Sequence, residues 1–388
     1  MRIAIVQHGD YAQAHRLMAE GKPETYAGQR DTIETYDQLF GRVPHLIVSL
    51  DGDSPPQRHG LGEYICVRPG KLPGLPRRVG LHLAAWRIRR QIQRLGATHL
   101  LLRCSNLVGC DLLAWANYRR VPAAVITAMR FDPKSSASRR FCRLANDENV
   151  ALVANHQRVA TESMYACGLR PGRAIAYDFA RPEDPDRFEP KSAPAGREPK
   201  LLFAGVISEP KGALDLLKAG ERLRRAGRKF RLVFLGDGPA RSVILNHPGA
   251  AEGWIESPGR VGNEQVVSSM HDSDIVIVPS RPEFPEGMPQ VLSEGLASRT
   301  PLIISDHSVF VGYFRDGHGV RYYSAGNDAA LAQAIAGLLD DPAEYERLSR
   351  ASADAWRSFQ IQTKFSDVLY RVGRLWSLDA AMAVTGVS

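Results

Sequence analysis

The sequence contains no apolar run approaching the roughly 18–20 residues that a membrane-spanning helix needs. Its first apolar stretch, Ile3–Val6, leads directly into Gln7 and His8 and lacks the small-residue cleavage site of a secretory signal peptide. We therefore expect a protein that starts at Met1 and stays in the cytoplasm.

Cysteine is scarce and confined to the first half of the chain, and no two cysteines form a C-x-x-C pair. With an odd number of them, neither a disulfide framework nor a zinc site is indicated. We expect buried, reduced thiols and no metal site. The cysteines are Cys66, Cys104, Cys110, Cys142 and Cys167.

Several cofactor and nucleic-acid motifs are also missing. After the first apolar stretch stands Gln7-His8-Gly9-Asp10 and not G-x-G-x-x-G, which argues against a nicotinamide cofactor. No P-loop G-x-x-x-x-G-K-[ST] occurs, so ATP hydrolysis is not expected. No nucleic-acid-binding motif is present either, although the net charge is +8.

The basic excess is concentrated between residues 68 and 94, where apolar side chains recur at helical spacing. A basic amphipathic helix can lie on an anionic membrane, and a core-packed helix with a solvated basic face gives the same pattern. Both interpretations stay open. The basic residues are Arg68, Lys71, Arg77, Arg78, Arg87, Arg89, Arg90 and Arg94, and the apolar ones are Leu81, Leu83, Trp86, Ile88, Ile92 and Leu95.

Short apolar segments alternate with helical stretches in both halves of the chain. Strands of this kind are buried on both faces, which predicts parallel sheets between layers of helices. The expected strands are 2–7, 46–50, 64–67, 99–103, 123–128, 150–154 and 174–177, and then 201–204, 231–235, 275–278 and 302–304. The second half is expected to hold helices at 213–226, 264–271, 289–298, 328–339 and 343–376.

A composition break separates the halves, because residues 181–200 are rich in proline and charge and poor in large apolar residues. The alternation predicts an α/β protein with two doubly wound, Rossmann-like domains facing each other across a cleft. We expect an N-terminal domain at 1–182, a linker at 183–199 and a C-terminal domain at 200–354. Residues 355–388 are expected to form a helix that returns to the N-terminal domain.

The stretch from Val278 to Glu294 carries the strongest chemical signal. A strand ends at Val278, a proline-rich loop follows, and Pro289 stands where a first helical residue would be. The free N–H groups and the dipole of such a helix end favour an anion. Gly287 allows close approach of a ligand, and Glu286 and Glu294 can accept hydrogen bonds from hydroxyl groups. These groups suit the polar parts of a nucleotide sugar.

Two further loops follow expected strands of the same domain. Gly205 is followed by Ser208-Glu-Pro-Lys211-Gly212, where the Lys211 ammonium can meet a phosphate. Gly238 belongs to Gly236-Asp-Gly-Pro, which by itself is ordinary turn chemistry and can also line a nucleotide pocket.

From Leu201 to about Trp356 these loops together resemble the C-terminal domain of the GT-B retaining glycosyltransferases of family 4. The resemblance implies that Lys211 and the N–H groups that follow Glu286 hold the donor diphosphate. It also implies that Glu286 contacts the donor sugar, that Glu294 contacts the ribose and that the base lies near Arg260-Val261. Gly205, Gly238, Gly287, Met288 and Pro289 would line the same donor site. The family needs neither a metal nor another cofactor.

Two positions depart from the family's pattern. Val206 stands where the family usually has an arginine, and the family's histidine is missing near Met129. Arg130 is the hypothesised substitute for both, so we predict catalytic roles for Glu286, Lys211 and Arg130. His8, Gly9 and Asp10 follow the first strand and are candidates for contacting the acceptor, with an ordinary loop as the alternative.

The resemblance predicts transfer of a sugar, with retention, from a nucleoside-diphosphate sugar to a saccharide or lipid-linked acceptor in bacterial-type polysaccharide or glycolipid assembly. From the basic charge we also expect peripheral contact with the anionic inner face of the membrane. We expect no nucleic-acid partner. Two alternatives remain: a non-catalytic protein of the same fold, and a nucleotide-sugar epimerase. The sequence does not specify the donor sugar, its base or the acceptor.

Overall fold

The structure is a computed structural model. It describes residues 1–21, 29–70, 73–74, 76–181, 183–284, 286 and 290–378 of the chain, without the side chains of residues 263 and 264. The chain forms two compact units. Unit 1 comprises Met1–Arg181 with Ile361–Ser388, and unit 2 comprises Pro182–Gln360.

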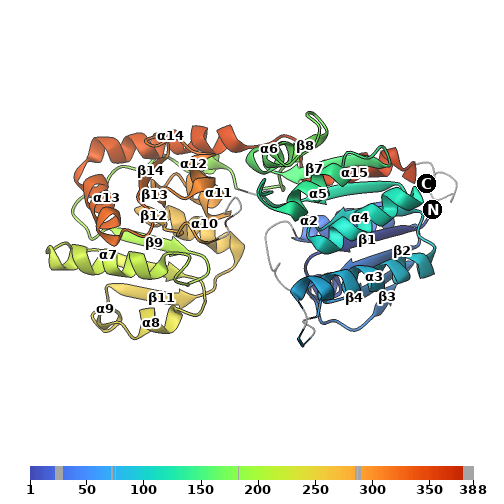
Figure 1. The fold of residues 1–388 in the computed structure, drawn as a ribbon. Coiled ribbons are helices and arrows are strands. Elements are labelled where there is room, and N and C mark those ends of the chain that lie inside the picture. The colour runs from blue at the N-terminus through green and yellow to red at the C-terminus, as the bar shows by residue number, and fades with distance from the viewer. Residues whose placement is uncertain are drawn as a thin grey trace. The chain divides into compact units, whose positions relative to one another are not determined.

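Unit 1 is built on an eight-stranded sheet in the order β3-β4-β2-β1-β5-β6-β7-β8, drawn in blue to green in Figure 1. All neighbouring strands are parallel except β3 and β4, which run antiparallel. The strands are β1 (Ile3–Gln7), β2 (His45–Ser49), β3 (Gln57–His59), β4 (Gly62–Cys66), β5 (His99–Arg103), β6 (Ala123–Thr127), β7 (Val150–His156) and β8 (Ala174–Tyr177).

Helices cover both faces of this sheet because successive side chains of each strand point to opposite sides. Ile3 and Ile5 of β1 belong to one buried cluster, with α1, α2 and α15, whereas Ala4 and Val6 belong to another, with α3, α4, α5 and α6. The helices are α1 (Tyr11–Ala19), α2 (Gln29–Phe40), α3 (Arg77–Leu95), α4 (Leu107–Arg119), α5 (Ser136–Leu144), α6 (Arg158–Ala166) and α15 (Phe365–Leu375).

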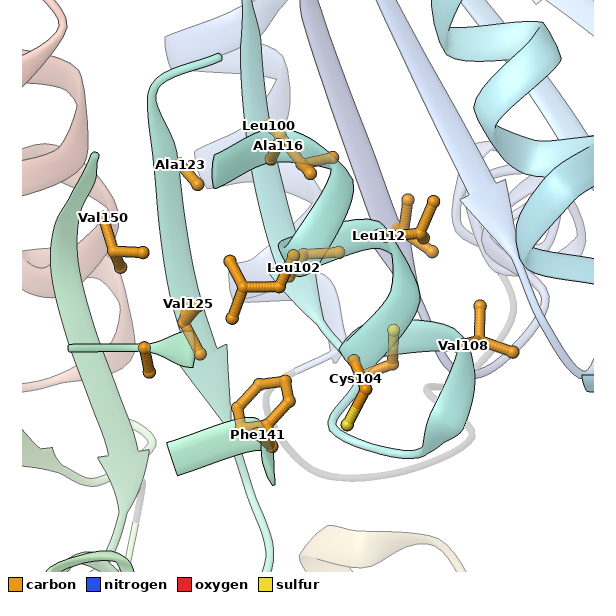
Figure 2. Close-up of a cluster of buried hydrophobic side chains, with 14 of the residues drawn as sticks. Leu100, Leu102, Cys104, Val108, Leu112, Ala116, Ala123, Val125, Phe141 and Val150 are labelled. Carbon is orange, nitrogen blue, oxygen red and sulfur yellow. The ribbon is translucent and has the colours of Figure 1, made fainter. Parts of the chain in front are cut away.

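Figure 2 shows part of the second cluster, where side chains of α4 and α5 lie against β5, β6 and β7. Leu102, Val125 and Phe141 are among its fully or almost fully buried members. Cys104 and Cys110 are buried in the same cluster, and burial raises the pKa of the Cys104 thiol to about 12. All five cysteines are free, and four are buried as expected, whereas Cys66 is half-buried.

Unit 2 has a six-stranded, wholly parallel sheet in the order β11-β10-β9-β12-β13-β14. The chain moves outward from β9 through β10 to β11 and then returns to the other side of β9 at β12. The direction of winding therefore reverses between β9 and β12. The strands are β9 (Lys200–Ala204), β10 (Arg231–Leu235), β11 (Ile255–Gly259), β12 (Ile275–Val278), β13 (Leu302–Ser305) and β14 (Val320–Tyr323).

The sheet of unit 2 is also covered on both faces. One buried cluster includes α7, α8 and α13, the other includes α10, α11 and α12, and α14 contributes to both. The helices are α7 (Ala213–Arg225), α8 (Arg241–Leu245), α9 (Pro248–Ala251), α10 (Asn263–His271), α11 (Gln290–Ala297), α12 (Ser308–Val311), α13 (Asp328–Asp340) and α14 (Pro342–Phe359), with a 3-10 turn η1 at Pro185–Arg187.

The structure adds three strands that the sequence did not indicate: β3, β11 and β14. Each is short and lies at an edge of its sheet. β3 (Gln57–His59) is wholly polar, and β11 and β14 mix polar and apolar residues, so the three strands lack the apolar run that marks a doubly buried strand.

The single helix predicted for 343–376 is wrong, because α14 ends at Phe359 and α15 begins at Phe365. Phe359 is buried in unit 2, whereas α15 packs on α2 and β7 of unit 1. The predicted return of the chain to the N-terminal domain is thus made by α15, and the predicted boundary at 355 falls inside α14.

Residues 183–199, expected as a linker, group with unit 2. The Lys191 ammonium donates to the backbone carbonyls of His271 and Ser273, and the Lys191 N–H donates to Ser349 Oγ over 2.7 Å. Arg197 forms a two-pronged ion pair with Asp274, at 2.7 and 2.5 Å. These charged groups hold the segment on unit 2, together with Ala193, which packs against the core of that unit, and Phe188, whose ring contacts His271.

The basic segment ending at Arg94 folds as α3, and its apolar side is used inside unit 1. Ile88 and Ile92 are buried, and Leu81 packs against the same cluster. Trp86 is the exception, 44% exposed, with the guanidinium of Arg90 5.0 Å from its ring centre. The structure therefore supports the core-packed interpretation of this helix, with a solvated basic face.

Candidate active site

The carboxyl ends of β9 and β12 lie side by side at the point where the winding of unit 2's sheet reverses. In open α/β sheets, ligands bind outside the carboxyl ends of the strands at such a point. Lys211 follows β9 and Glu286 follows β12, so the topology brings together two residues that the sequence analysis had placed in one site.

Lys211 and Glu286 form an ion pair, with 2.5 Å between Nζ and Oε1. Their side chains are 17% and 5% exposed. The hydroxyl of Ser280 donates to the same carboxylate oxygen, also over 2.5 Å, and the ammonium lies 4.5 Å from the centre of the Phe284 ring. Because both charged groups are shielded and oriented, they are held ready for a ligand that offers an anion and hydroxyl groups.

Glycines allow the loops after β9, β10 and β12 to contact one another through their backbones. A Cβ on Gly212 would lie 1.9 Å from the carbonyl oxygen of Pro279, and one on Gly236 would lie 1.9 Å from that of Gly205. A Cβ on Gly238 would meet the Ile207 carbonyl at 2.4 Å. Since real side chains cannot approach so closely, only glycine permits this packing.

Arg281 is part of this loop cluster and was missed by the sequence analysis. Its guanidinium binds the buried Asp215 carboxylate through two hydrogen bonds of 2.8 and 2.7 Å and that of Glu209 through one of 2.9 Å. Its N–H donates to the Pro210 carbonyl. These bonds, above all to Asp215, raise the pKa of Arg281. Arg281 therefore ties the β12 loop to the loop that carries Lys211.

The other predicted donor-site residues are placed as follows. Glu294 lies in α11 and is 9% exposed, Val261 is half-buried just after β11, and Val206 is exposed beside Gly205. Gly287, Met288 and Pro289 lie outside the described residues. The structure thus brings Gly205, Lys211, Gly238 and Glu286 to one edge of unit 2, and their roles in binding stay predictions.

In unit 1, the loop after β1 contacts the loop after β2. His8 Nδ1 lies 2.7 Å from the Asp51 carboxylate, which also accepts the Gly9 N–H over 3.2 Å. Burial raises the pKa of Asp51, but hydrogen bonds from His8 and Gly9 outweigh it, so this pKa is lowered. His8 is exposed, and the predicted acceptor contact of this loop stays a prediction.

Asp10 fixes the shape of these loops. One carboxylate oxygen accepts the Gln13 N–H over 3.0 Å, and the other accepts the N–H groups of Asp53 and Ser54 and the Ser54 hydroxyl. Burial raises the pKa of Asp10, yet these hydrogen bonds lower it below its ordinary value. Since both oxygens are occupied, Asp10 caps α1 and anchors the Asp53 loop.

Arg130 lies in the exposed loop after β6 and makes no hydrogen bond or ion pair with any residue that the structure describes. The backbone before it is fixed, because the buried Asn155 amide donates to the Met129 carbonyl over 2.9 Å and accepts the Met129 N–H over 3.3 Å. Its guanidinium is therefore presented from a rigid base and available to a ligand.

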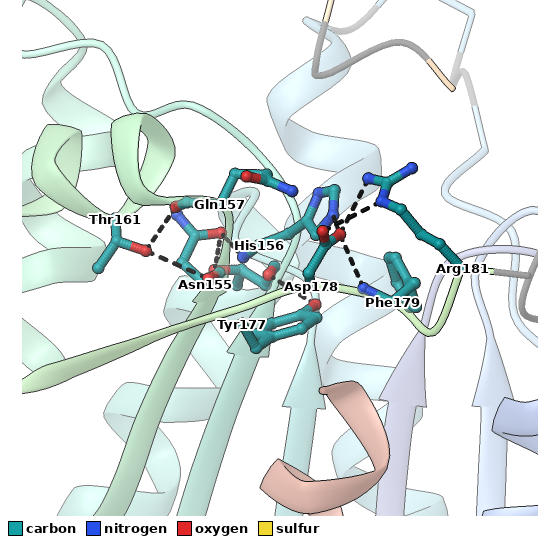
Figure 3. Close-up of polar contacts among 9 residues, drawn as sticks. Asn155, His156, Gln157, Thr161, Tyr177, Asp178, Phe179 and Arg181 are labelled. Carbon is teal, nitrogen blue, oxygen red and sulfur yellow. Dashed lines mark hydrogen bonds and ion pairs between the residues drawn. The ribbon is translucent and has the colours of Figure 1, made fainter. Parts of the chain in front are cut away.

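A buried network around Asp178, shown in Figure 3, was not visible in the sequence. Asp178 is fully buried. Its carboxylate lies 3.0 Å from His156 Nε2 and accepts hydrogen bonds of 3.0 and 3.1 Å from the Arg181 guanidinium. Burial raises the pKa of Asp178, but His156 and Arg181 lower it to about 2. Its backbone also bonds to Thr363 and Phe365, so one residue holds both segments where the chain leaves and re-enters unit 1.

Within the described part of the chain, no helix is long and apolar enough to cross a membrane. The same residues contain no group of three or more histidine, cysteine, aspartate or glutamate side chains arranged to hold a metal ion.

Two doubly wound, Rossmann-like units are the architecture of the GT-B fold. Residues 184–354, which make up most of unit 2, match the family described as Glycosyl transferases group 1, in agreement with the resemblance of the unit 2 loops to family 4. It transfers a sugar from a nucleotide-sugar donor.

Curated relatives are glycosyltransferases of varied purpose. The chain is 29% identical to alpha-D-kanosaminyltransferase of Streptomyces kanamyceticus over 82% of its own length and 91% of that protein. It is 29% identical to phosphatidyl-myo-inositol mannosyltransferase of Mycobacterium leprae, but over 44% of its own length and 45% of that protein.

Solved structures show the same fold at low sequence identity. Anabaena Alr3699/HepE in complex with UDP is 13% identical, with a TM-score of 0.63 over 99% of both chains. Sucrose-phosphate synthase of Thermosynechococcus elongatus is 16% identical, with a TM-score of 0.63 over 98% of this chain and all of that one.

Proposed function

We propose that this glycosyltransferase moves a sugar, with retention and without a metal, to a saccharide or lipid-linked acceptor in bacterial-type polysaccharide or glycolipid assembly. The observation that carries the proposal is the shielded Lys211–Glu286 pair at the switch point of unit 2. A nucleotide sugar offers a diphosphate to the lysine and hydroxyl groups to the glutamate. The donor therefore gives each charged group a new partner when it enters.

In the proposed donor complex, Lys211 contacts the diphosphate and Glu286 accepts hydrogen bonds from the donor sugar. The start of α11 adds its dipole near the same diphosphate, and Glu294 inside α11 binds the ribose. A Cβ on Gly205 would meet no other atom within 4 Å, so the backbone there leaves room for the nucleotide, and Gly238 packs on Ile207 beside it. Val261, after β11, lies beside the base.

During transfer, negative charge grows on the leaving diphosphate as its bond to the sugar breaks. Lys211 is placed to stabilise that charge, and Arg130 is the proposed second cation in place of the arginine missing at Val206. Fixed charges of this kind are the main contribution that a protein makes to such a step. With retention, the leaving phosphate helps to deprotonate the acceptor on the same face of the sugar.

Uridine diphosphate sugars are the first donors to test. Structural neighbours include Alr3699/HepE complexes with UDP and with UDP-glucose. A transfer assay would use UDP-glucose, GDP-mannose and ADP-glucose with a mixture of saccharide and lipid-linked acceptors, in EDTA. We expect transfer from one donor, unaffected by EDTA, and an α-linked product by NMR. Inversion, or activity restored only by a divalent metal, would contradict the proposal.

We also propose that the protein works in the cytoplasm, at the inner face of the membrane. Trp86 and Arg90 are exposed on α3, and a tryptophan among basic side chains suits an anionic bilayer surface. Binding to vesicles with anionic lipid should fall as salt rises and should be weaker for Trp86→Ala. Equal binding to neutral vesicles would argue against this contact.

A further inference from the structure

A groove of about 650 Å3 runs along one side of unit 1, between the β3–β4 pair and α3. Four arginines line it: Arg58 from β3, Arg68 just after β4, and Arg87 and Arg94 from α3. This groove is separate from every residue assigned to the donor site, since all of those lie in unit 2 or in other loops of unit 1.

Three of the four guanidinium groups are paired with two carboxylates. Arg58 and Arg94 both bind Glu63, at 2.9 and 2.5 Å, and Arg68 pairs with Asp53 at 2.6 Å. Among the described residues, Arg87 makes no hydrogen bond or ion pair. The groove therefore carries excess positive charge, with one guanidinium left to a ligand.

The groove is larger and less uniformly polar than an ion site. Its volume falls within the roughly 300–1,000 Å3 that small-molecule sites occupy. Ile65 and Val67 give it an apolar floor, and Gln57 and Gln91 add side-chain amides. A sugar ring has both apolar C–H faces and hydroxyl groups, so this lining suits a saccharide better than a bare anion.

One end of the groove is bonded to the loop predicted to meet the acceptor. Arg68 donates to the Asp51 carbonyl over 3.2 Å, and the Asp51 carboxylate holds His8 and the Gly9 N–H. A ligand lying in the groove would thus have one end at the carboxyl edge of unit 1's sheet.

We propose that the groove between β3–β4 and α3 binds an acidic saccharide, whose carboxylate or phosphate group contacts Arg87 and Arg94. Its far end reaches the His8 loop. If the proposed function holds, this saccharide is the acceptor, which makes the acceptor an anionic glycan or the anionic headgroup of a glycolipid.

Calorimetric titration would test the proposal with two matched pairs of probes. The first pair compares an acidic saccharide, a hyaluronan tetrasaccharide, with a neutral one, chitotetraose. The second pair compares a sugar phosphate, glucose 6-phosphate, with inorganic phosphate. We expect one or both acidic sugars to bind and the neutral sugar and free phosphate to bind far more weakly. Arg87→Gln/Arg94→Gln should weaken acidic-sugar binding by about tenfold or more, because charged hydrogen bonds are lost.

The control is Arg77→Gln/Arg78→Gln, which removes the same charge from the exposed start of α3, outside the groove. It should change the affinity by less than about twofold, because exposed distant charges are screened by salt. If both variants weaken acidic-sugar binding equally, the affinity depends only on the overall charge of the protein, and the proposal is overturned. The proposal is also overturned if neither acidic sugar binds.

A third measurement distinguishes a free acidic saccharide from an anionic membrane as the ligand of the groove. It also distinguishes failure of the groove proposal from failure of the proposed function. If only anionic vesicles bind, in a way that needs Arg87 and Arg94, the groove is a membrane contact and the saccharide site is refuted. Binding of nucleoside diphosphates that is unchanged in Arg87→Gln/Arg94→Gln reports on the proposed donor site and not on the groove. Intact nucleotide binding without acidic-sugar binding would refute the groove and leave the proposed function standing.

Discussion

The carboxyl edges of the two sheets are built in different ways. In unit 2, loops pack backbone to backbone through Gly212, Gly236 and Gly238, and the central charges are paired and shielded. In unit 1, loops are held by side chains such as Asp10, while His8 and Arg130 remain exposed. The rigid loops of unit 2 suit a ligand whose shape does not vary. In unit 1, exposed side chains would determine which ligand binds.

The largest effect should follow from the shielded pair of unit 2. Glu286→Gln keeps the shape and a hydrogen-bond acceptor for Ser280 but removes the charge facing Lys211. We expect the rate of sugar transfer to fall by about 100-fold or more, as when a positioned electrostatic group is lost. Initial rates at saturating donor would measure this.

The matched control for that variant is Glu283→Gln in the same loop, because Glu283 is exposed and its nearest cation, Arg281, is 3.9 Å away. Its rate should stay within about twofold of the original, in line with the small effect of a screened surface charge. Similar losses in both variants would mean that the loop's overall charge matters and the pair does not.

A glycine comparison tests the close packing of the unit 2 loops. Gly212 and Gly9 both have positive φ, at 73° and 83°, but only Gly212 has an atom within 4 Å of an added Cβ. Gly9→Ala should cost about 1–2 kcal/mol, the ordinary cost of a left-handed backbone. Gly212→Ala should lower the stability of unit 2 clearly more, because Lys211's loop must move away from Pro279.

Thermal unfolding of the two alanine variants would measure this difference. Equal melting temperatures would show that the contact between the loops is unimportant for stability.

The two units should respond to opposite extremes of pH. The pKa of Asp178 in unit 1 is lowered to about 2 against a model-compound value of 3.8. Its stabilising contribution is therefore complete above about pH 4 and is lost as the pH falls toward 2, because the unfolded chain takes up the proton first. Acid unfolding followed by circular dichroism should show a smaller loss over this interval for Asp178→Asn, which starts from a lower stability.

The second pH effect concerns unit 2. Burial lowers the pKa of Lys191 to about 8 from 10.5, so the unfolded chain binds more protons between these values. The stability of unit 2 should then rise from pH 8 to about 10, and Lys191→Met should abolish that rise. Denaturant midpoints across this interval would measure it, and an unchanged slope in the variant would exclude Lys191 as the cause.

The sequence predicted the parts of the fold that local pattern controls. Strands such as Ile275–Val278 are apolar throughout, and the loop glycines and Lys211 follow predicted strands directly. The family resemblance placed Lys211 and Glu286 in one site, whereas the ion pair between them is a finding of the structure.

The rest depended on contacts between distant segments. Asp178 contacts His156 and Thr363, and Arg281 contacts Asp215. These partners are far apart in the sequence, so no local sequence pattern predicts the contacts. The break at residues 360–364 was missed for the same reason: the helical pattern continues across it, but Asp178 binds the backbone there. The arginine groove joins β3, an unpredicted strand, to α3, so it too was invisible in the sequence.

The central claim is that the donor binds at the carboxyl edge of unit 2. Hydrogen exchange measured by mass spectrometry, with and without a saturating nucleotide sugar, tests it most directly. We predict slower exchange in peptides covering 205–212, 236–241 and 290–297, and little change in the His8 loop, with the protection reduced in Glu294→Ala. Protection confined to unit 1, or none in these three peptides under conditions where the nucleotide sugar binds, would contradict the account.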